Sequence, residues 1–305
     1  MTYSIVARDP ETGELGGAVQ SHWFAAGNGV IWAEPAAGAV ATQAYAEVSY
    51  GPLGLDLMRA GKSAEEALRA LVSADEGEVH RQVAMVDARG GVAAHTGSRC
   101  IRAAGHRTGD GFSVQANMML NDTVWDAMHD AFSATTGTLA ERFLVALDAA
   151  EAEGGDIRGR QAAGIVVVRA TSTGRRWEDR TVDVRVEDSG APLPELRRLV
   201  GLQSAYDRLE AAEEHELARD LGAALAEQQA ALALAPDNPE IAFWTAVSLA
   251  GAGRVDDARR TIEVAYEAHP GWVELLRRLA GDGLVEIAPD VLAKLVWEGE
   301  STWRT

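Results

Sequence analysis

Residues 1–21 are MTYSIVARDPETGELGGAVQS, and the fold prediction starts from this stretch. Tyr3–Ala7 and Leu15–Val19 are rich in strand-forming residues. The sequence DPETG at residues 9–13 lies between them and has the composition of a turn. The chain is therefore predicted to open with a β-hairpin.

Similar patterns continue over roughly the first two thirds of the chain. Ser63 and Glu66 form a capping-box sequence that predicts a helix from residue 64. Further strands are expected at 30–33, 39–44, 82–86, 92–95, 112–119, 165–168 and 182–186, and helices at 53–60, 64–73, 123–132 and 139–153. Because hairpins dominate this order, we expect an α+β protein with antiparallel sheets flanked by helices.

The strand signal ends near Leu193, and the remainder is predicted to be all-helical. A 34-residue spacing within it is typical of tetratricopeptide repeats, although an alanine-rich helical hairpin would also explain it. The spacing relates Ala224, Ala231 and Pro236 to Ala258, Ala265 and Pro270. We expect domains at 1–192 and 193–305. Two repeats are too few to stand alone, so the tail should pack on the first domain or on a second copy, which favours a homo-oligomer.

Composition excludes several classes of function. The chain has 305 residues, with 46 acidic and 28 basic side chains and a formal net charge of −18. That charge repels nucleic acid and anionic membranes, so neither is an expected partner. The chain has one cysteine, Cys100, no long apolar run and no signal-peptide pattern, and a cytoplasmic location is expected. His22, His95 and His106 lack a short-spaced ligand pair, so no metal or other cofactor is expected.

Thr2 is the first candidate for chemistry. Removal of Met1 would expose a threonine that carries a nucleophilic hydroxyl and, in its own α-amine, a base. The α-amine of an ordinary peptide titrates near ~7.7–8.0. The alternative is that Thr2 is an ordinary strand residue, or that Met1 is kept and Thr2 has no free amine.

Seven motifs together resemble a known family. They are MTYSIVARDP (1–10), GAVQSHWF (17–24), GAVATQ (38–43), YGPLGL (50–55), HTG (95–97), QAN (115–117) and GGDIRGRQ (154–161). In this order they resemble the domain-of-unknown-function 1028 family, which is grouped with the N-terminal-nucleophile (Ntn) hydrolases. The resemblance covers about residues 1–190 and implies a four-layer αββα sandwich with two antiparallel sheets, followed here by the helical tail.

The resemblance also implies amide-bond hydrolysis at the level of the superfamily. By analogy of strand order, the nucleophile would be Thr2, and the second and fourth strands would line the cleft. The implied catalytic set is Thr2, Gln20, Ser21, His22, Thr42, Gln43 and Asn117. Backbone amides at residues 42–44 would hold the oxyanion, with Gln43 and Asn117 as additional donors. His22 would be either a general base or a structural residue beside Trp23.

Residues 154–161 allow two interpretations. The segment could be a helix C-cap and turn in which Asp156 pairs with an arginine. It could instead supply a substrate-binding arginine fork for a carboxylate, with Arg160 favoured over Arg158 and with Asp156 and Gln161 as neighbours. The glycine spacing does not fit a nucleotide-binding loop.

The sequence also departs from related enzymes. No lysine precedes Lys62, which speaks against a proteasome-like mechanism, and Ala162 stands where relatives often have serine. The predicted function is amide hydrolysis of a small amide or peptide-like substrate. The alternative is a non-catalytic module that binds a small ligand or docks a partner, with peptidoglycan binding by the tail a weaker possibility.

Overall fold

The computed structural model describes residues 2–296, and its contacts divide the chain between Val200 and Gly201. The expected boundary after residue 192 coincides with the start of α6 (Pro192–Leu217). Leu193, Leu196 and Val200 from the first turns of this helix belong to the core of the first unit. The contact boundary therefore falls inside α6.

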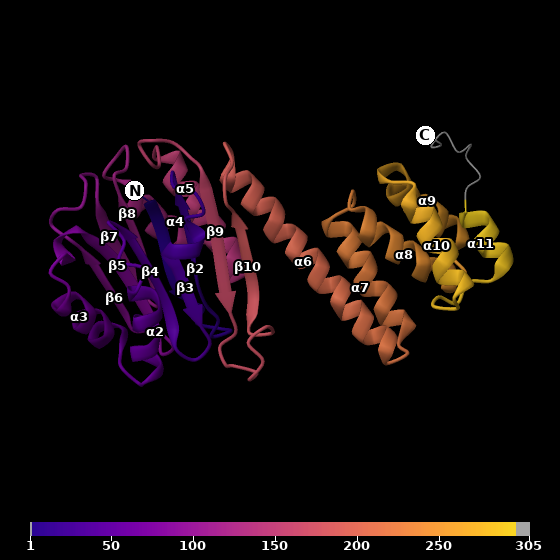
Figure 1. Ribbon diagram of the computed structural model, residues 1–305, viewed down its shortest axis with the longest axis horizontal. Coiled ribbons are helices and arrows are strands. Elements are labelled where there is room, and N and C mark those ends of the chain that lie inside the picture. The colour runs from indigo at the N-terminus through magenta and orange to yellow at the C-terminus, as the bar shows by residue number, and fades with distance from the viewer. Residues whose placement is uncertain (1, 297–305) are drawn as a thin grey trace. The chain divides into compact units, whose positions relative to one another are not determined.

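Two antiparallel sheets form the centre of the first unit, as predicted (Figure 1). The larger sheet has the order β10 (Arg180–Val186), β9 (Ala162–Val168), β2 (Leu15–Ser21), β1 (Thr2–Arg8), β8 (Phe112–Asn117) and β7 (Gly105–Gly109). The smaller sheet has the order β3 (Ile31–Glu34), β4 (Gly38–Ala44), β5 (Arg81–Asp87) and β6 (Val92–Thr96). The N-terminal hairpin is confirmed, because β1 pairs with β2 from Thr2–Ser21 to Arg8–Leu15.

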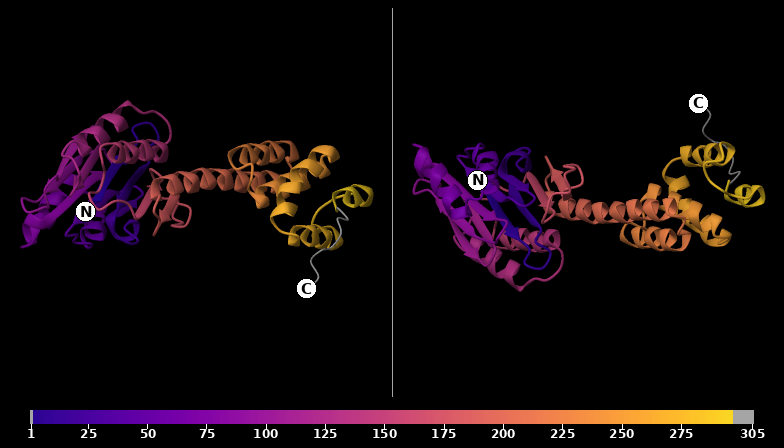
Figure 2. Two further views of the ribbon diagram at one scale, coloured as in Figure 1. Left: turned by 90° about the horizontal axis from the view of Figure 1, so that it is seen from above. Right: turned by 90° about the horizontal axis from the view of Figure 1, so that it is seen from below.

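Helices cover the outer face of each sheet, so the unit has four layers (Figure 2). Helices α4 (Val124–Ala134) and α5 (Leu139–Ala152) share a core with the larger sheet. Helices α2 (Tyr50–Arg59) and α3 (Ala64–Ala74) share a core with the smaller sheet. A third core lies between the sheets, beside the short helix α1 (Gly27–Val30). The α+β class is therefore confirmed.

Strand alternation decides which residues can meet between the sheets. On β1, Tyr3 and Ile5 belong to the core with α4 and α5, whereas Val6 belongs to the core between the sheets. Successive side chains along a strand point to opposite faces of the sheet, so every second residue shares a face. Thr2 and Ser4 therefore face the second sheet.

Local signals predicted most elements within a few residues. The capping box at α3 is present, since Glu66 N donates to Ser63 Oγ at 3.2 Å and Ser63 N donates to Glu66 Oε2 at 3.0 Å. Strand β7 was not predicted. Its residues 106–108 are polar and exposed, so they show no apolar alternation.

The second unit is helical in its described part. After the end of α6 come α7 (Leu221–Leu234), α8 (Pro239–Gly251), α9 (Val255–Ala268), α10 (Gly271–Gly281) and α11 (Pro289–Leu295). The bounds of α9 are those of α7 shifted by 34 residues, from 221 to 255 and from 234 to 268. The four repeated alanines, Ala224, Ala231, Ala258 and Ala265, are buried. Among the described residues, no helix is long and apolar enough to cross a membrane.

Candidate functional site

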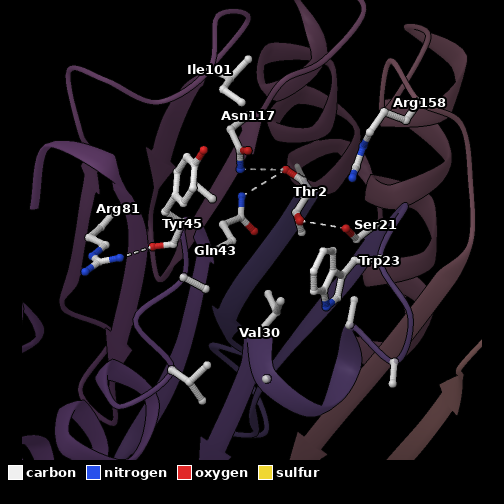
Figure 3. Close-up of a pocket in the computed structure, with 16 residues that line it drawn as sticks. Thr2, Ser21, Trp23, Val30, Gln43, Tyr45, Arg81, Ile101, Asn117 and Arg158 are labelled. Carbon is white, nitrogen blue, oxygen red and sulfur yellow. Dashed lines mark hydrogen bonds between the residues drawn. The ribbon is translucent and has the colours of Figure 1, made fainter. Parts of the chain in front are cut away.

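A cavity of about 510 Å³ lies in the first unit where several strand ends meet (Figure 3). Thr2 begins β1, whereas Ser21 and Asn117 end the two strands that flank it and pair directly with Thr2. Gln43 approaches from the end of β4 in the other sheet. These four residues all line the cavity, and Thr2 is 4% exposed. The structure thus brings Thr2, Ser21, Gln43 and Asn117 together, as expected.

Buried amide side chains hold the backbone of Thr2. Gln43 Nε2 donates to the Thr2 carbonyl oxygen at 3.1 Å, and Asn117 Nδ2 lies 3.4 Å from the same oxygen. Both amide nitrogens also donate to Gln82 Oε1, at 2.7 and 2.9 Å. Gln82 in turn donates through Nε2 to Thr96 Oγ1 and to the backbone oxygens of residues 105 and 116.

This network changes the role expected for Gln43 and Asn117. Each side-chain amide has two N–H donors, and these hydrogen bonds direct them to Thr2 and Gln82. These amides therefore fix Thr2 and are not available as oxyanion donors. Gln82 was missed from the sequence, although a polar residue in the otherwise apolar strand 82–86 was a usable signal.

The hydroxyl groups of Thr2 and Ser21 form a hydrogen bond, with an Oγ1–Oγ distance of 3.0 Å. Either hydroxyl can be the donor. Both side chains are buried at the cavity wall. The Thr2 hydroxyl is consequently held at a defined position by its strand neighbour.

Arg158 is the member of the 154–161 segment that lines the cavity. Gly154 and Gly155 follow the end of α5 with φ values of +102° and +55°, a conformation that favours glycine. Asp156 follows with a completely buried carboxylate, which accepts from Arg158 Nε at 3.1 Å and from Arg158 Nη2 at 2.8 Å. His22 N also donates to this carboxylate at 3.2 Å, so the loop is tied to the end of β2. The predicted pairing of Asp156 with an arginine is confirmed.

The other two polar residues of the segment point elsewhere. Arg160 is paired with Glu151 of α5, and Gln161 Nε2 donates to Asp188 Oδ1 at 3.2 Å. Neither lines the cavity. The structure therefore places Arg158, and not the preferred Arg160, at the cavity wall, because the turn at residues 156–159 directs the earlier arginine inward.

Gln20, Thr42 and His22 do not line the cavity either. Gln20 pairs with Tyr3 and shares its face, which is covered by α5, so its amide lies on the opposite side of the sheet from Thr2. Thr42 Oγ1 donates to the Glu47 carbonyl oxygen at 3.0 Å. His22 Nδ1 lies 3.2 Å from the Arg160 carbonyl oxygen. These positions favour the structural interpretation of His22.

The rest of the cavity wall is mostly apolar. Trp23 and Tyr45 stand at the wall with exposed fractions of 69% and 63%. The remaining lining residues are Ala25, Ala26, Gly29, Val30, Ala44, Ala46, Val48, Arg81 and Ile101. No aspartate or glutamate is among the residues that line this cavity in the described chain. The cavity therefore combines an apolar wall with two guanidinium groups.

Backbone geometry near the end of β4 is unusual. Ala44 has a φ of +71° and Ala25 a φ of +53°, and both line the cavity. Non-glycine residues in this region carry strain that concentrates at functional sites. Pairing between β3 and β4 stops at Ile31–Ala41, so no strand lies along that edge at residues 42–44 in the described structure.

The remaining titratable candidates are not arranged for catalysis. Burial raises the pKa of the Cys100 thiol, which opposes formation of a thiolate nucleophile. Burial also lowers the pKa of His106, whose Nδ1 lies 2.8 Å from Thr96 Oγ1. Within residues 2–296, no group of three or more His, Cys, Asp or Glu side chains is placed to hold a metal ion.

Comparisons with known proteins identify similar sequences over the first unit. A model of a family of unknown function, DUF1028, matches residues 2–196. The crystal structure of a protein from Silicibacter pomeroyi that matches the same family model is 32% identical, with a TM-score of 0.59. That similarity covers 65% of this chain and 84% of the other. No curated protein matches this chain.

Proposed function

The chain belongs to DUF1028, a family of unknown function, and we propose that it is an N-terminal-nucleophile amidohydrolase. In this proposal Thr2, once Met1 has been removed, attacks the carbonyl carbon of a small amide or peptide-like substrate. The supporting observation is that Thr2 begins a central strand and lines the cavity of about 510 Å³. A cavity of this size is typical of small-molecule sites.

The proton transfers of the acylation step involve only Thr2 and the substrate. Thr2 Oγ1 forms a bond to the carbonyl carbon, and the hydroxyl proton passes to the free α-amine of the same residue. The tetrahedral intermediate then collapses, the C–N bond breaks, and the resulting ammonium gives its proton to the leaving amine. Thr2 is left as an ester of the acyl group.

Hydrolysis of the ester restores the enzyme. Water attacks the ester carbonyl carbon while the α-amine accepts a proton from the water. The bond between the acyl carbon and Thr2 Oγ1 breaks, the acid leaves, and the proton returns to the hydroxyl. Ser21, whose hydroxyl lies 3.0 Å from that of Thr2, orients the attacking oxygen of Thr2 in the acylation step.

We assign the oxyanion to backbone N–H groups at the end of β4. The side-chain amides of Gln43 and Asn117 are committed to Thr2 and Gln82. Beyond Ala41 the edge of β4 has no neighbouring strand in the described chain, and Ala44 lines the cavity. Donors at such an edge can stabilise a developing negative charge without reorganisation.

The test compares chains that differ only at the N-terminus. One chain begins at Thr2, and a second carries a glutamine inserted between Met1 and Thr2 so that methionine is retained. Both are treated with a β-lactone, which acylates activated hydroxyl groups, and the N-terminal peptide is examined by mass spectrometry. The proposal expects an adduct on Thr2 of the first chain only.

Two variants complete this experiment. Thr2→Ala should give no adduct, whereas Thr181→Ala should react like the parent, because Thr181 Oγ1 bonds to Glu14 and lies outside the cavity. Labelling of the methionine-retaining chain, or undiminished labelling of Thr2→Ala, would contradict the proposal and favour a ligand-binding module.

A further inference from the structure

We infer that the acyl group of the substrate is aromatic and uncharged, and that it packs against Trp23 and Tyr45. This inference rests on the proposed function, because it names the substrate class of the same cavity. It follows from two exposed aromatic side chains that are held at the cavity wall, and from arginines in that wall that are already paired with carboxylates.

The cavity wall carries large apolar side chains that the fold leaves exposed to solvent. Trp23 and Tyr45 are more than 60% exposed, and Val48 and Ile101 are more than 40% exposed. They come from segments that follow β2, β4 and β6, which are far apart in the sequence. Figure 3 shows the rings of Trp23 and Tyr45 on opposite sides of Gln43. Exposed apolar side chains gathered around a concave site favour the binding of an apolar group.

Tyr45 is held in position by the protein itself. Its backbone N donates to the His80 carbonyl oxygen at 3.3 Å, and its own carbonyl oxygen accepts from Arg81 Nη1 at 2.7 Å. The rings of Tyr45 and His80 form a T-shaped pair, with their centroids 5.6 Å apart. A side chain that is already ordered loses little conformational entropy when a ligand binds to it.

The segment that carries Trp23 is tied to the protein on both sides of this residue. His22, which precedes it, donates through its backbone N to Asp156 Oδ2 at 3.2 Å. Ala25, which follows two residues later, donates through its backbone N to the Glu187 carbonyl oxygen at 3.0 Å. The backbone therefore holds Trp23 at the wall, although most of the side chain is exposed.

Both arginines of the described cavity wall have carboxylate partners. Arg81 Nε donates to Asp75 Oδ2 at 2.8 Å, and Arg158 pairs with the completely buried carboxylate of Asp156 at 2.8 Å. No aspartate or glutamate of residues 2–296 lines the cavity. A charged acyl group would lose its hydration here without gaining an unpaired side chain of opposite charge, and this cost favours an uncharged group.

The occupant is a small molecule, because the two rings border a cavity that also contains the nucleophile. The cavity has a volume of about 510 Å³, which is in the usual range for small-molecule sites. Thr2 is 4% exposed and lines this cavity, so a substrate whose acyl group contacts the rings can present its amide to Thr2. An aromatic acyl group gains from burial of its surface and from edge-to-face or offset-stacked contacts with the two rings.

The experiment measures binding separately from turnover. The Thr2→Ala chain, trimmed to begin at residue 2, is titrated calorimetrically with 3-phenylpropanamide. It is also titrated with propanamide, which lacks the ring, and with 3-(4-carboxyphenyl)propanamide, which adds a charge to the ring. We expect both analogues to bind about tenfold or more weakly than 3-phenylpropanamide. Equal affinities for 3-phenylpropanamide and either analogue, or no measurable binding of 3-phenylpropanamide, would overturn the inference.

Variants assign the preference to the two rings. The paired change Trp23→Ala with Tyr45→Ala, made in the same chain, should weaken binding of 3-phenylpropanamide about tenfold or more. Because both side chains are exposed, these changes should leave the fold intact, which circular dichroism checks. Trp177→Ala is the matched control and should bind like the parent, since Trp177 is 78% exposed and lies outside the cavity. Unchanged affinity in the paired variant would also overturn the inference.

Turnover distinguishes this inference from the proposed function. The trimmed wild-type chain is incubated with 3-phenylpropanamide and with propanamide, and the ammonia released from each is measured. Hydrolysis of the two amides at equal rates supports the proposed function and overturns the substrate class. Selective binding without any release of ammonia supports the ligand class and contradicts the hydrolase.

Discussion

The hydroxyl of Thr2 lies 3.0 Å from the hydroxyl of Ser21, across the first hairpin of the chain. Thr2 and Ser21 are directly paired residues of an antiparallel ladder, so their side chains lie on the same face. That face opens to the cavity. In the proposed mechanism, this relationship gives Ser21 a specific task, which is to orient the attacking oxygen.

The first prediction concerns Ser21. Ser21→Ala removes the hydrogen bond to Thr2, and we expect kcat on a cleaved amide to fall about tenfold, the equivalent of ~1.4 kcal/mol. KM should stay nearly constant, because the hydroxyl acts on the nucleophile. Ser21→Thr keeps an oxygen at this position and should recover most of the activity. Equal kcat values for Ser21→Ala and the parent would remove Ser21 from the mechanism.

The second prediction compares two buried glutamines. Gln82→Met removes the acceptor of Gln43 and Asn117, and we expect the free energy of unfolding to fall by roughly 2–4 kcal/mol, because two buried donors lose a partner. Gln20→Met should leave stability unchanged or raise it by about 1 kcal/mol, since both polar atoms of its amide are buried with no hydrogen-bond partner among residues 2–296.

Urea unfolding of both variants, monitored by circular dichroism, measures these differences. Equal losses of stability in Gln82→Met and Gln20→Met would mean that the network around Thr2 has no special role in the fold.

The third prediction concerns acid stability. Hydrogen bonds from Arg81, Gly77 N and Tyr50 lower the pKa of Asp75 from its usual 3.8 to about 2, with Arg81 the largest cause. A lowered pKa adds stability that is present above about pH 4 and is lost as the pH falls toward about 2. Asp75→Asn should therefore reduce stability at pH 7 and flatten its decline between pH 4 and pH 2.

The measurement is the urea midpoint at closely spaced pH values. Asp110→Asn, at an exposed turn position, serves as the control and should keep the parent's slope. If the urea midpoint of the Asp75→Asn chain falls between pH 4 and pH 2 as steeply as that of the parent, other groups govern acid stability.

The fourth prediction concerns the helical unit. Ala265 is completely buried on α9, so Ala265→Leu should overpack its contacts and destabilise this unit by about 1–3 kcal/mol. Ala268, in the last turn of the same helix, is exposed, and Ala268→Leu should change stability by less than about 0.5 kcal/mol. Thermal unfolding followed by far-ultraviolet circular dichroism compares them, and similar midpoints would refute close packing at Ala265.

Much of the fold could be predicted because its signals are local. Three patterns each specify an element through residues that are close together in the sequence. They are the turn sequence at residues 9–13, the capping box of Ser63 and Glu66, and the apolar run at 165–168. Strand β7 lacked such a signal, because its polar residues 106–108 are exposed and its pairing with β8 holds it in the sheet.

The site was only partly predictable. The sequence by itself brought Thr2 and Ser21 to one end of a hairpin, because antiparallel pairing joins the start of one strand to the end of the next. The sequence did not determine that Gln20 faces α5 while Ser21 faces the cavity. Alternation along the strand puts these neighbours on opposite faces of the sheet, but only the packing of the layers decides which face meets the second sheet. The tertiary structure likewise decided that Arg158 lines the cavity and Arg160 pairs with Glu151, because a buried Asp156 fixes one arginine and α5 offers a carboxylate to the other.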